Sequence, residues 1–183
     1  MADLVQSIQD KLREETFTRT TIGNYTQNDI AELAKIMEQA HAENCEKELK
    51  SICEEHLLHN KDSIISLYIC GMLSLESVDN SALVTLVDIF QKNHKSNIVV
   101  DLCNHVLASD PNNKFALRTL ADTYLADKND EAWALYERLV RIDFDEADLT
   151  KLLAEHYDSI DKELAVNYYK KAIVRYINLN NYN

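Results

Sequence analysis

The chain has 183 residues and contains only 2 Gly and 1 Pro, far below the roughly 7% Gly and 5% Pro of an average protein. Strand-rich folds, glycine-rich phosphate loops and proline-rich linkers need more of both residues, so the composition excludes them and favours a nearly all-helical protein. The formal net charge of −12 disfavours phosphate backbones as direct ligands and favours protein or peptide partners over nucleic acid.

Helical periodicity begins at residue 2 and predicts a first helix over about 2–15. The threonine-rich residues 16–26 oppose helix formation and predict a long connection. Thr26 followed by Asp29 is a start signal for the next helix. A third helix is predicted over about 43–60.

The apolar segment 63–75 predicts a fourth helix, buried on most sides. Thirteen helical residues span about 20 Å, which is short of the roughly 30 Å core of a bilayer, so a membrane span is not expected. The N-terminal residues lack the basic and long apolar regions of a signal peptide, which predicts a cytoplasmic protein. The four cysteines are then expected to be reduced core residues: Cys45, Cys53, Cys70 and Cys103.

From residue 80 onward, one order of residue sizes recurs three times, with Leu117 lying 34 residues after Leu83. Each window predicts a pair of packed helices, in which a small residue lets the helices approach and an aromatic ring fills the space beside it. The first helices carry Leu83, Leu86, Val87 and Phe90; Leu117, Leu120, Ala121 and Tyr124; and Leu153, Ala154 and Tyr157. The second helices carry Val99, Cys103, Val106 and Leu107; Ala132, Tyr136, Leu139 and Val140; and Ala165, Tyr169, Ala172 and Ile173.

These windows resemble the tetratricopeptide repeat, most closely in residues 117–124 followed by Ala132 and Tyr136. The proline between repeats is present once, as Pro111, and Phe144 takes its place in the next repeat. The resemblance implies an all-α fold, a right-handed helical-repeat solenoid of antiparallel helix pairs with about ten helices. It divides the chain into N-terminal helices and divergent hairpins at 1–79, repeats at 80–113, 114–146 and 147–178, and a tail at 179–183.

In such repeats the first helix of each pair lines a concave groove, so the resemblance implies a protein-binding or peptide-binding surface. Phe115 would be an apolar anchor, Arg118 and Lys151 would bind acidic groups, and Asp88 and Asp122 would bind basic ones. The alternative interpretation is a plain solvated face. The positions that match the groove are Val84, Thr85, Asp88, Phe115, Arg118, Asp122, Lys151 and Glu155.

The order of elements in the first part of the chain is similar to the N-terminal extension of long Gre-type transcription elongation factors. A leading helix is followed by the residues Glu-Glu-Thr-Phe-Thr-Arg-Thr-Thr-Ile-Gly-Asn-Tyr-Thr (14–26) and then by helical repeats. The resemblance implies an interaction module that acts with RNA polymerase. It also implies that the chain is a fragment, because the coiled-coil tip by which Gre factors promote transcript cleavage has no counterpart here. The alternative is a free-standing cytoplasmic scaffold or adaptor without a role in transcription.

No pattern indicates an enzyme, a metal site or a cofactor. Cys53, His56 and His59 do not share one helix face, and Cys103 and His105 point apart. The acidic residues Asp143, Asp145, Glu146 and Asp148 favour the dipole of a following helix, or alternatively form a patch for a basic partner.

The last predicted helix, about 161–178, places Ala165, Tyr169, Ala172 and Tyr176 along one face. Solenoids end in a polar cap, whereas this helix is both basic and aromatic, so further repeats, a partner or self-association could cover it. The alternative is that the Lys and Arg stems cover the apolar surface by themselves.

Overall fold

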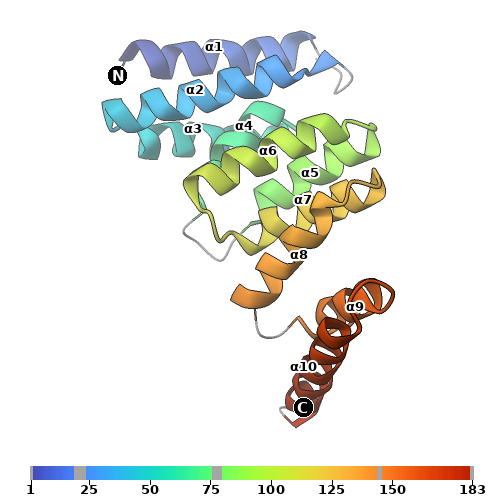
Figure 1. The fold of residues 1–183 in the computed structure, drawn as a ribbon. Helices are drawn as coiled ribbons and strands as arrows, with labels where there is room; N and C mark the ends of the chain where they lie inside the picture. Colours follow the sequence, from blue (N-terminus) through green and yellow to red (C-terminus); the bar gives the residue numbers. More distant parts are fainter. Residues whose placement is uncertain (1, 19–23, 76–79, 144–145, 182–183) are drawn as a thin grey trace. The chain divides into compact units, whose positions relative to one another are not determined.

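The computed structural model describes residues 2–18, 24–75, 80–143 and 146–181 (Figure 1). These residues form ten α-helices and no strand, which confirms the predicted all-α fold class of helix pairs. The helices are α1 (Ala2–Thr18), α2 (Gln27–Glu43), α3 (Glu46–His59), α4 (Ile64–Met72), α5 (Ser81–Lys92), α6 (Ser96–Ser109), α7 (Lys114–Ala126), α8 (Glu131–Ile142), α9 (Ala147–Tyr157) and α10 (Lys162–Asn181).

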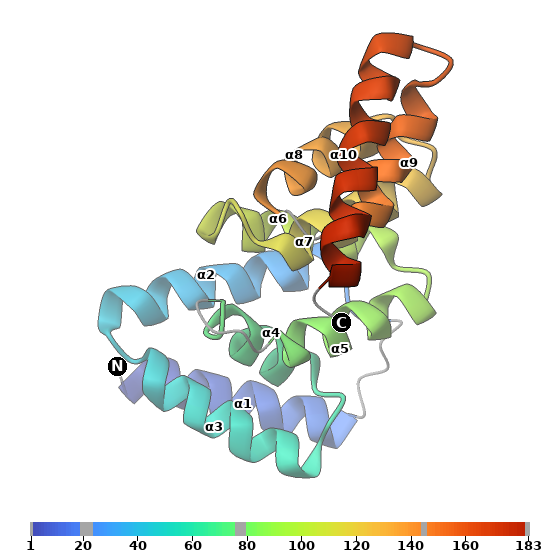
Figure 2. The same ribbon diagram turned by 90° about the horizontal axis from the view of Figure 1, so that it is seen from below.

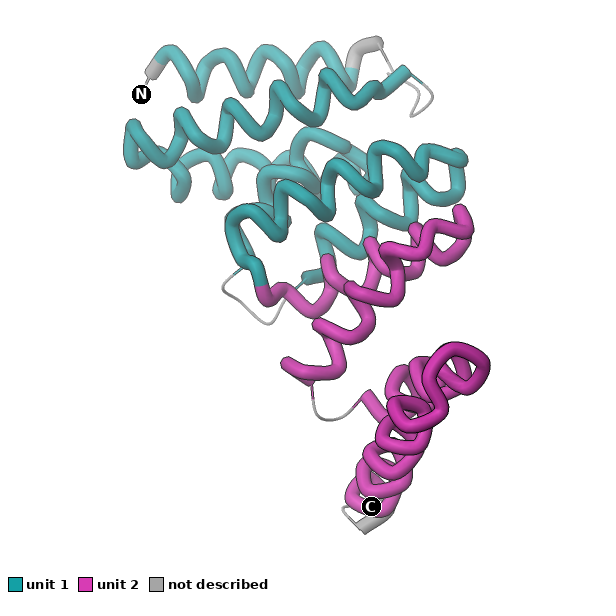
Figure 3. The backbone as a smooth tube through the Cα atoms, viewed as in Figure 1, with its two compact units in different colours: residues 1–111 teal, residues 112–183 magenta. Residues whose placement is uncertain are grey.

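The chain divides into two compact units, residues 1–111 and 112–183 (Figure 3). The first unit contains α1 to α6, and the second contains two helix pairs, α7 with α8 and α9 with α10. The boundary that the sequence predicts between residues 79 and 80 marks the start of the repeat pattern rather than the edge of a compact unit, and it stays a prediction.

Helix ends follow local side-chain chemistry. Thr26 caps α2 as predicted: its hydroxyl accepts from the Asp29 N–H, and the Asp29 carboxylate accepts from the Thr26 N–H at 2.7 Å. The first helix continues to Thr18, past its predicted end. Within it, the Thr16 hydroxyl donates a hydrogen bond to the Leu12 carbonyl at 2.9 Å. The rest of the predicted connection, residues 19–23, lies outside the described residues.

The apolar helix α4 forms the centre of the first unit, where it packs against α2, α3 and α5 (Figure 2). Every residue from Ile64 to Gly71 is buried, as the sequence predicts. Gly71 permits the close approach of α5, because a Cβ atom there would lie only 2.6 Å from Leu83 Cδ2. Gly71 thus has the role that Ala121 and Ala154 have in the later repeats.

Glu15 joins α1 to the start of α4. Its carboxylate accepts hydrogen bonds from the Tyr25 hydroxyl at 2.5 Å, the Ser63 hydroxyl at 2.5 Å and the Ile64 N–H at 2.9 Å. A negative charge at a helix N-terminus is stabilising, and here it comes from a residue distant in sequence. Burial and the adjacent Glu15 carboxylate raise the pKa of Tyr25, so its hydroxyl remains a donor.

In the second unit, Ala121 and Ala154 are fully buried at the positions that the repeat pattern assigns to small residues. Leu120 is also buried, whereas the rings of Tyr124 and Tyr157 are half-buried at the edge of their pairs. The small residues are therefore buried as predicted in both pairs, whereas the aromatic positions are less enclosed than the repeat pattern predicts. The predicted Phe144 position lies outside the described residues.

The last helix differs from its predicted packing. Tyr168, rather than Tyr169, is the buried ring beside Ala165 and Ala172, and Ile173 is 58% exposed. The reason is that α10 packs on α9 and no later helix covers its outer side among the described residues. The helix also runs to Asn181, into the region that the sequence assigned to a tail.

Replacing Ala121 by leucine should destabilise the chain by about 1–3 kcal/mol, because added carbons overpack a closed core. Urea unfolding followed by the fluorescence of the single tryptophan, Trp133, measures this in the second unit. Ala126→Leu is the matched control, because Ala126 is an exposed residue of the same helix. Equal losses for the two variants would contradict the close approach of the helices at Ala121.

Replacing Glu15 by alanine should cost about 2–3 kcal/mol, because it leaves the Ser63 hydroxyl and the Ile64 N–H without their acceptor. Circular dichroism during urea unfolding measures the loss, with the exposed neighbour Glu14→Ala as control. Glu15→Gln should be less damaging than Glu15→Ala, since the amide retains one acceptor oxygen. A Glu15→Ala variant as stable as the control would show that this cap contributes little.

Candidate protein-binding site

Three of the predicted groove residues lie along one side of α7. Phe115, Arg118 and Asp122 are spaced by three and four residues, which brings them onto neighbouring turns of the same face. Phe115 and Arg118 are half-buried and Asp122 is exposed. Asn113 caps the start of α7: its side chain accepts from the Ala116 N–H at 3.0 Å and so fixes the first turn, which carries Phe115.

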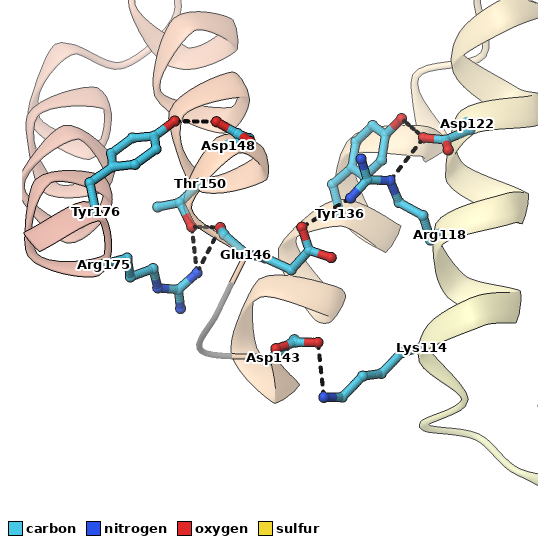
Figure 4. A network of polar contacts seen from close by, with 10 residues as sticks. All are labelled: Lys114, Arg118, Asp122, Tyr136, Asp143, Glu146, Asp148, Thr150, Arg175 and Tyr176. Carbon is cyan, nitrogen blue, oxygen red and sulfur yellow. Dashed lines mark hydrogen bonds and ion pairs between the residues drawn. The ribbon is translucent and has the colours of Figure 1, made fainter. Parts of the chain in front are cut away.

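Arg118 lies between two carboxylates (Figure 4). Its Nε atom is 3.4 Å from Asp122 Oδ1, and its Nη1 atom is 3.0 Å from Glu146 Oε2. The Tyr136 hydroxyl of α8 donates to the same Asp122 oxygen at 2.6 Å. Burial and the Asp122 carboxylate raise the pKa of Tyr136, so this hydroxyl stays protonated at neutral pH. The network holds both polar residues of the α7 face in one orientation.

The remaining predicted groove residues form separate sets. On α9, Lys151 Nζ lies 3.4 Å from Glu155 Oε1. On α5, in the first compact unit, the Thr85 hydroxyl donates to the Ser81 carbonyl at 2.8 Å and Val84 is 42% exposed. Asp88 of that helix pairs with Lys92 at 3.9 Å. Exposed pairs of this kind contribute only a few tenths of a kcal/mol each, so the charges of a partner can replace them at little cost.

The acidic residues that follow α8 form ion pairs and hydrogen bonds with other residues of the second unit. Asp143 pairs with Lys114 at 2.9 Å, Glu146 pairs with Arg118, and Asp148 accepts a hydrogen bond from the Tyr176 hydroxyl. Asp145 lies outside the described residues. The structural interpretation of this run is therefore favoured over a patch for a basic partner.

Arg175 has a role that the sequence did not reveal. From α10 it donates to the Val140 carbonyl at 2.8 Å. It also donates to the Glu146 carbonyl at 3.2 Å and to the Thr150 hydroxyl (Figure 4). These acceptors belong to the end of α8 and the start of α9, so one guanidinium connects three helices. The sequence indicated only a basic residue on the last helix, because nothing in its periodicity identifies carbonyl acceptors on other helices.

Glu137 of α8 is a second polar link in this unit. The hydroxyls of Tyr157 and Tyr168 donate to the same Glu137 oxygen at 2.8 and 3.3 Å, and the two rings stack with centroids 5.8 Å apart. The hydrogen bond to Glu137, with burial, raises the pKa of Tyr157 to about 12. A tyrosine at a repeat position thus fills space with its ring and also binds a neighbouring helix.

The geometry of the cysteine and histidine residues considered in the sequence does not favour thiol catalysis or metal binding. Burial raises the pKa of the Cys103 thiol to about 12, so it is not a thiolate at neutral pH. His105 Nδ1 lies 3.2 Å from the Tyr68 hydroxyl. Cys53 is buried while His59 is exposed, and the described residues contain no group of three His, Cys, Asp or Glu side chains arranged to hold a metal ion. Among the same residues, no helix has both the length and the apolarity to cross a membrane.

Comparison with known proteins supports the resemblance to Gre-related proteins. A protein of Treponema pallidum described as a putative GreA-associated domains protein is 44% identical over 156 residues, which cover 84% of this chain and 24% of that protein. The transcription elongation factor GreA of Borreliella burgdorferi is 33% identical over 176 residues, which cover 94% of this chain and 19% of that protein. The chain is similar to two proteins whose names contain GreA. It spans about a quarter or less of their length, and no family model matches it.

Solved structures that resemble the chain include one described as "Crystal structure of MamA", with a TM-score of 0.49 and 14% identity, which covers 79% of this chain and 96% of that chain. A MamA RS-1 ArsTM double mutant has a TM-score of 0.47 and 15% identity, and covers 80% of this chain and 94% of that chain. At this level of identity the likeness concerns the fold alone.

Replacing Arg175 by lysine should destabilise the second unit by about 1–3 kcal/mol, because an ammonium group cannot reach three separated acceptors as the planar guanidinium does. Urea unfolding followed by Trp133 fluorescence measures the loss. Arg141→Lys is the control, since the Arg141 side chain is 74% exposed and pairs with Glu137 on its own helix. If both substitutions are neutral, Arg175 does not hold these helices together.

Proposed function

We propose that the chain is a protein-binding helical module of a Gre-related transcription elongation factor and that it acts with RNA polymerase. The observation that carries this proposal is the 44% and 33% identity to two GreA-named proteins over 84% and 94% of the chain. The helix pairs of the described residues fit this role, because such pairs present long, exposed helix faces to a partner. A module of this kind would work in the cytoplasm, without a cofactor or a catalytic centre.

The contact surface that we propose is the part of the predicted groove that lies within the second compact unit, on α7 and α9. On α7, the half-buried Phe115 ring offers apolar area beside the Arg118 guanidinium, a combination that is common at binding hot spots. The charged groove residues already form ion pairs, Arg118 with Asp122 and Lys151 with Glu155. These side chains are about half exposed, and each pair contains one positive and one negative charge. Such a surface suits a peptide of mixed charge, which could replace each pair with an equivalent one.

Binding of the 183-residue chain to purified RNA polymerase, measured by biolayer interferometry, tests the proposal. Phe115→Ala and Lys151→Glu should each weaken binding by tenfold or more, because one removes an apolar anchor and the other reverses a charge of the groove. Arg118→Glu should have a similar effect, and its far-ultraviolet spectrum will show whether the helices persist.

Lys128→Glu serves as the control, since Lys128 is exposed in the turn between α7 and α8 and the charge change is the same. Unchanged affinity in all three groove variants would overturn the assignment of the groove. No binding of the wild-type chain to the polymerase would overturn the proposed partner and would favour a free-standing scaffold.

A further inference from the structure

The second compact unit, residues 112–183, has another candidate binding surface, which lies between α8 and α10. These are the second helices of its two helix pairs. The two helices border a groove of about 570 Å³. Val140 and Tyr168 form its buried floor, and Val174 lines it while remaining 56% exposed. None of the predicted groove residues on α7 or α9 contributes to this space, so it is distinct from the surface proposed above.

The groove has a basic rim. Arg141 of α8 and Lys170 and Lys171 of α10 line it, together with the Arg175 guanidinium that binds the helix ends. Lys171 Nζ lies 5.3 Å from the centre of the Tyr168 ring, over the floor of the groove. Glu137 is the one acidic residue among those that line the groove, and its carboxylate already accepts from Tyr157, Tyr168 and, at 3.3 Å, the exposed Arg141.

This local excess of positive charge is unusual in the chain, which carries a net charge of −12. A basic, apolar-floored groove in an acidic protein attracts a partner of opposite charge to one place, because the rest of the surface repels it. Charge complementarity therefore points to an acidic partner.

Apolar side chains continue from the groove along α10. Ile177 follows Val174 by three residues and is 54% exposed, and Ile173 is 58% exposed. Contiguous apolar side chains beside charged residues mark interaction surfaces more often than lone exposed ones do. The lining residues of α10 extend from Tyr168 to Asn178, a length of about 15 Å, which matches roughly three turns of a bound helix.

We propose that the groove between α8 and α10 binds an acidic amphipathic helix of a partner protein. The apolar face of that helix would lie on Val140, Tyr168 and Val174, and its acidic flanks would pair with Arg141, Lys170 and Lys171. This is the helix-in-groove mode of recognition, in which apolar anchors supply affinity and charges set the choice of partner.

Other occupants fit the groove less well. A second copy of α10 would bring Lys170 and Lys171 of both copies together, and like charges repel. Phosphate backbones and anionic lipid surfaces match the basic rim, but they do not use a buried apolar floor. A helix that has both acidic and apolar faces uses both features of the groove.

Fluorescence anisotropy with the 183-residue chain and a panel of labelled 15-residue peptides tests the proposal. The peptides carry leucine, isoleucine or phenylalanine at helical spacing with glutamate on the flanks. Control peptides carry lysine in place of glutamate, or the same composition in scrambled order. Binding should require both glutamate and helical spacing, and it should weaken as salt is added, because the charges of the groove are exposed.

In the protein, Lys170→Glu combined with Lys171→Glu should lower the affinity by tenfold or more, and Val174→Glu should do the same. Lys162→Glu is the control: it reverses the charge of one exposed lysine of α10 that lies outside the groove, and each single variant, Lys170→Glu and Lys171→Glu, makes the same charge change within the groove. Far-ultraviolet spectra and Trp133 fluorescence will show that each variant is folded. Amide chemical-shift changes on peptide addition should concentrate in residues 137–141 and 168–178.

Four outcomes would overturn the proposal. They are no binding by any acidic peptide, equal binding by the lysine peptides, equal losses in Lys162→Glu and the groove variants, and shift changes located elsewhere. Preferential binding of single-stranded RNA or of vesicles that contain phosphatidylglycerol would identify a different class of ligand. A dimer that Val174→Glu dissociates would instead identify a second copy of the chain as the occupant.

Discussion

Most of the described helices have one apolar face and α4 is buried on all sides, and burying this apolar surface against neighbouring helices is the constraint on which the structure depends. Isolated helices of 11 to 14 residues, such as α9 and α6, are marginal in water, so packing rather than intrinsic propensity supplies their stability. Two helices can pack closely only where small residues lie at the contact between them. Ala121 and Ala154 supply them in the second unit, and Gly71 supplies one in the first, where it accommodates Leu83.

Polar residues add a second level of organisation to this packing. In the first unit the Glu15 carboxylate binds the start of α4, and in the second unit Glu137 and Glu146 connect α8 and α9 to side chains of other helices. Part of the strong acidity of the chain is thus structural, because carboxylates accept hydrogen bonds from tyrosine hydroxyls, arginine and helix N-termini. Arg175 performs the reverse function by donating to the Val140 carbonyl near the end of α8 and to the Glu146 carbonyl just before α9.

The two proposed surfaces of the second unit differ in chemical character, and that difference bears on function. The α7 and α9 side chains form charge-balanced pairs, and α7 also carries the half-buried Phe115, which suits a peptide of mixed charge. The groove between α8 and α10 combines a basic rim with an apolar floor. A module with two such surfaces could hold two partners at once, which fits a role in joining a Gre-related factor to other proteins.

The sequence by itself determined the helical class, the Thr26 cap, the burial of α4 and the small residues of the repeats, because each depends on local spacing or on the size of one side chain. It also placed Phe115, Arg118 and Asp122 on one side of a helix. Only the tertiary structure decided that Tyr168 rather than Tyr169 is buried, that Arg175 binds carbonyl groups on two other helices, and that a basic groove lies beside it. These features depend on the rotation of one helix against its neighbours and on backbone acceptors far away in sequence, and residue spacing within one helix contains neither.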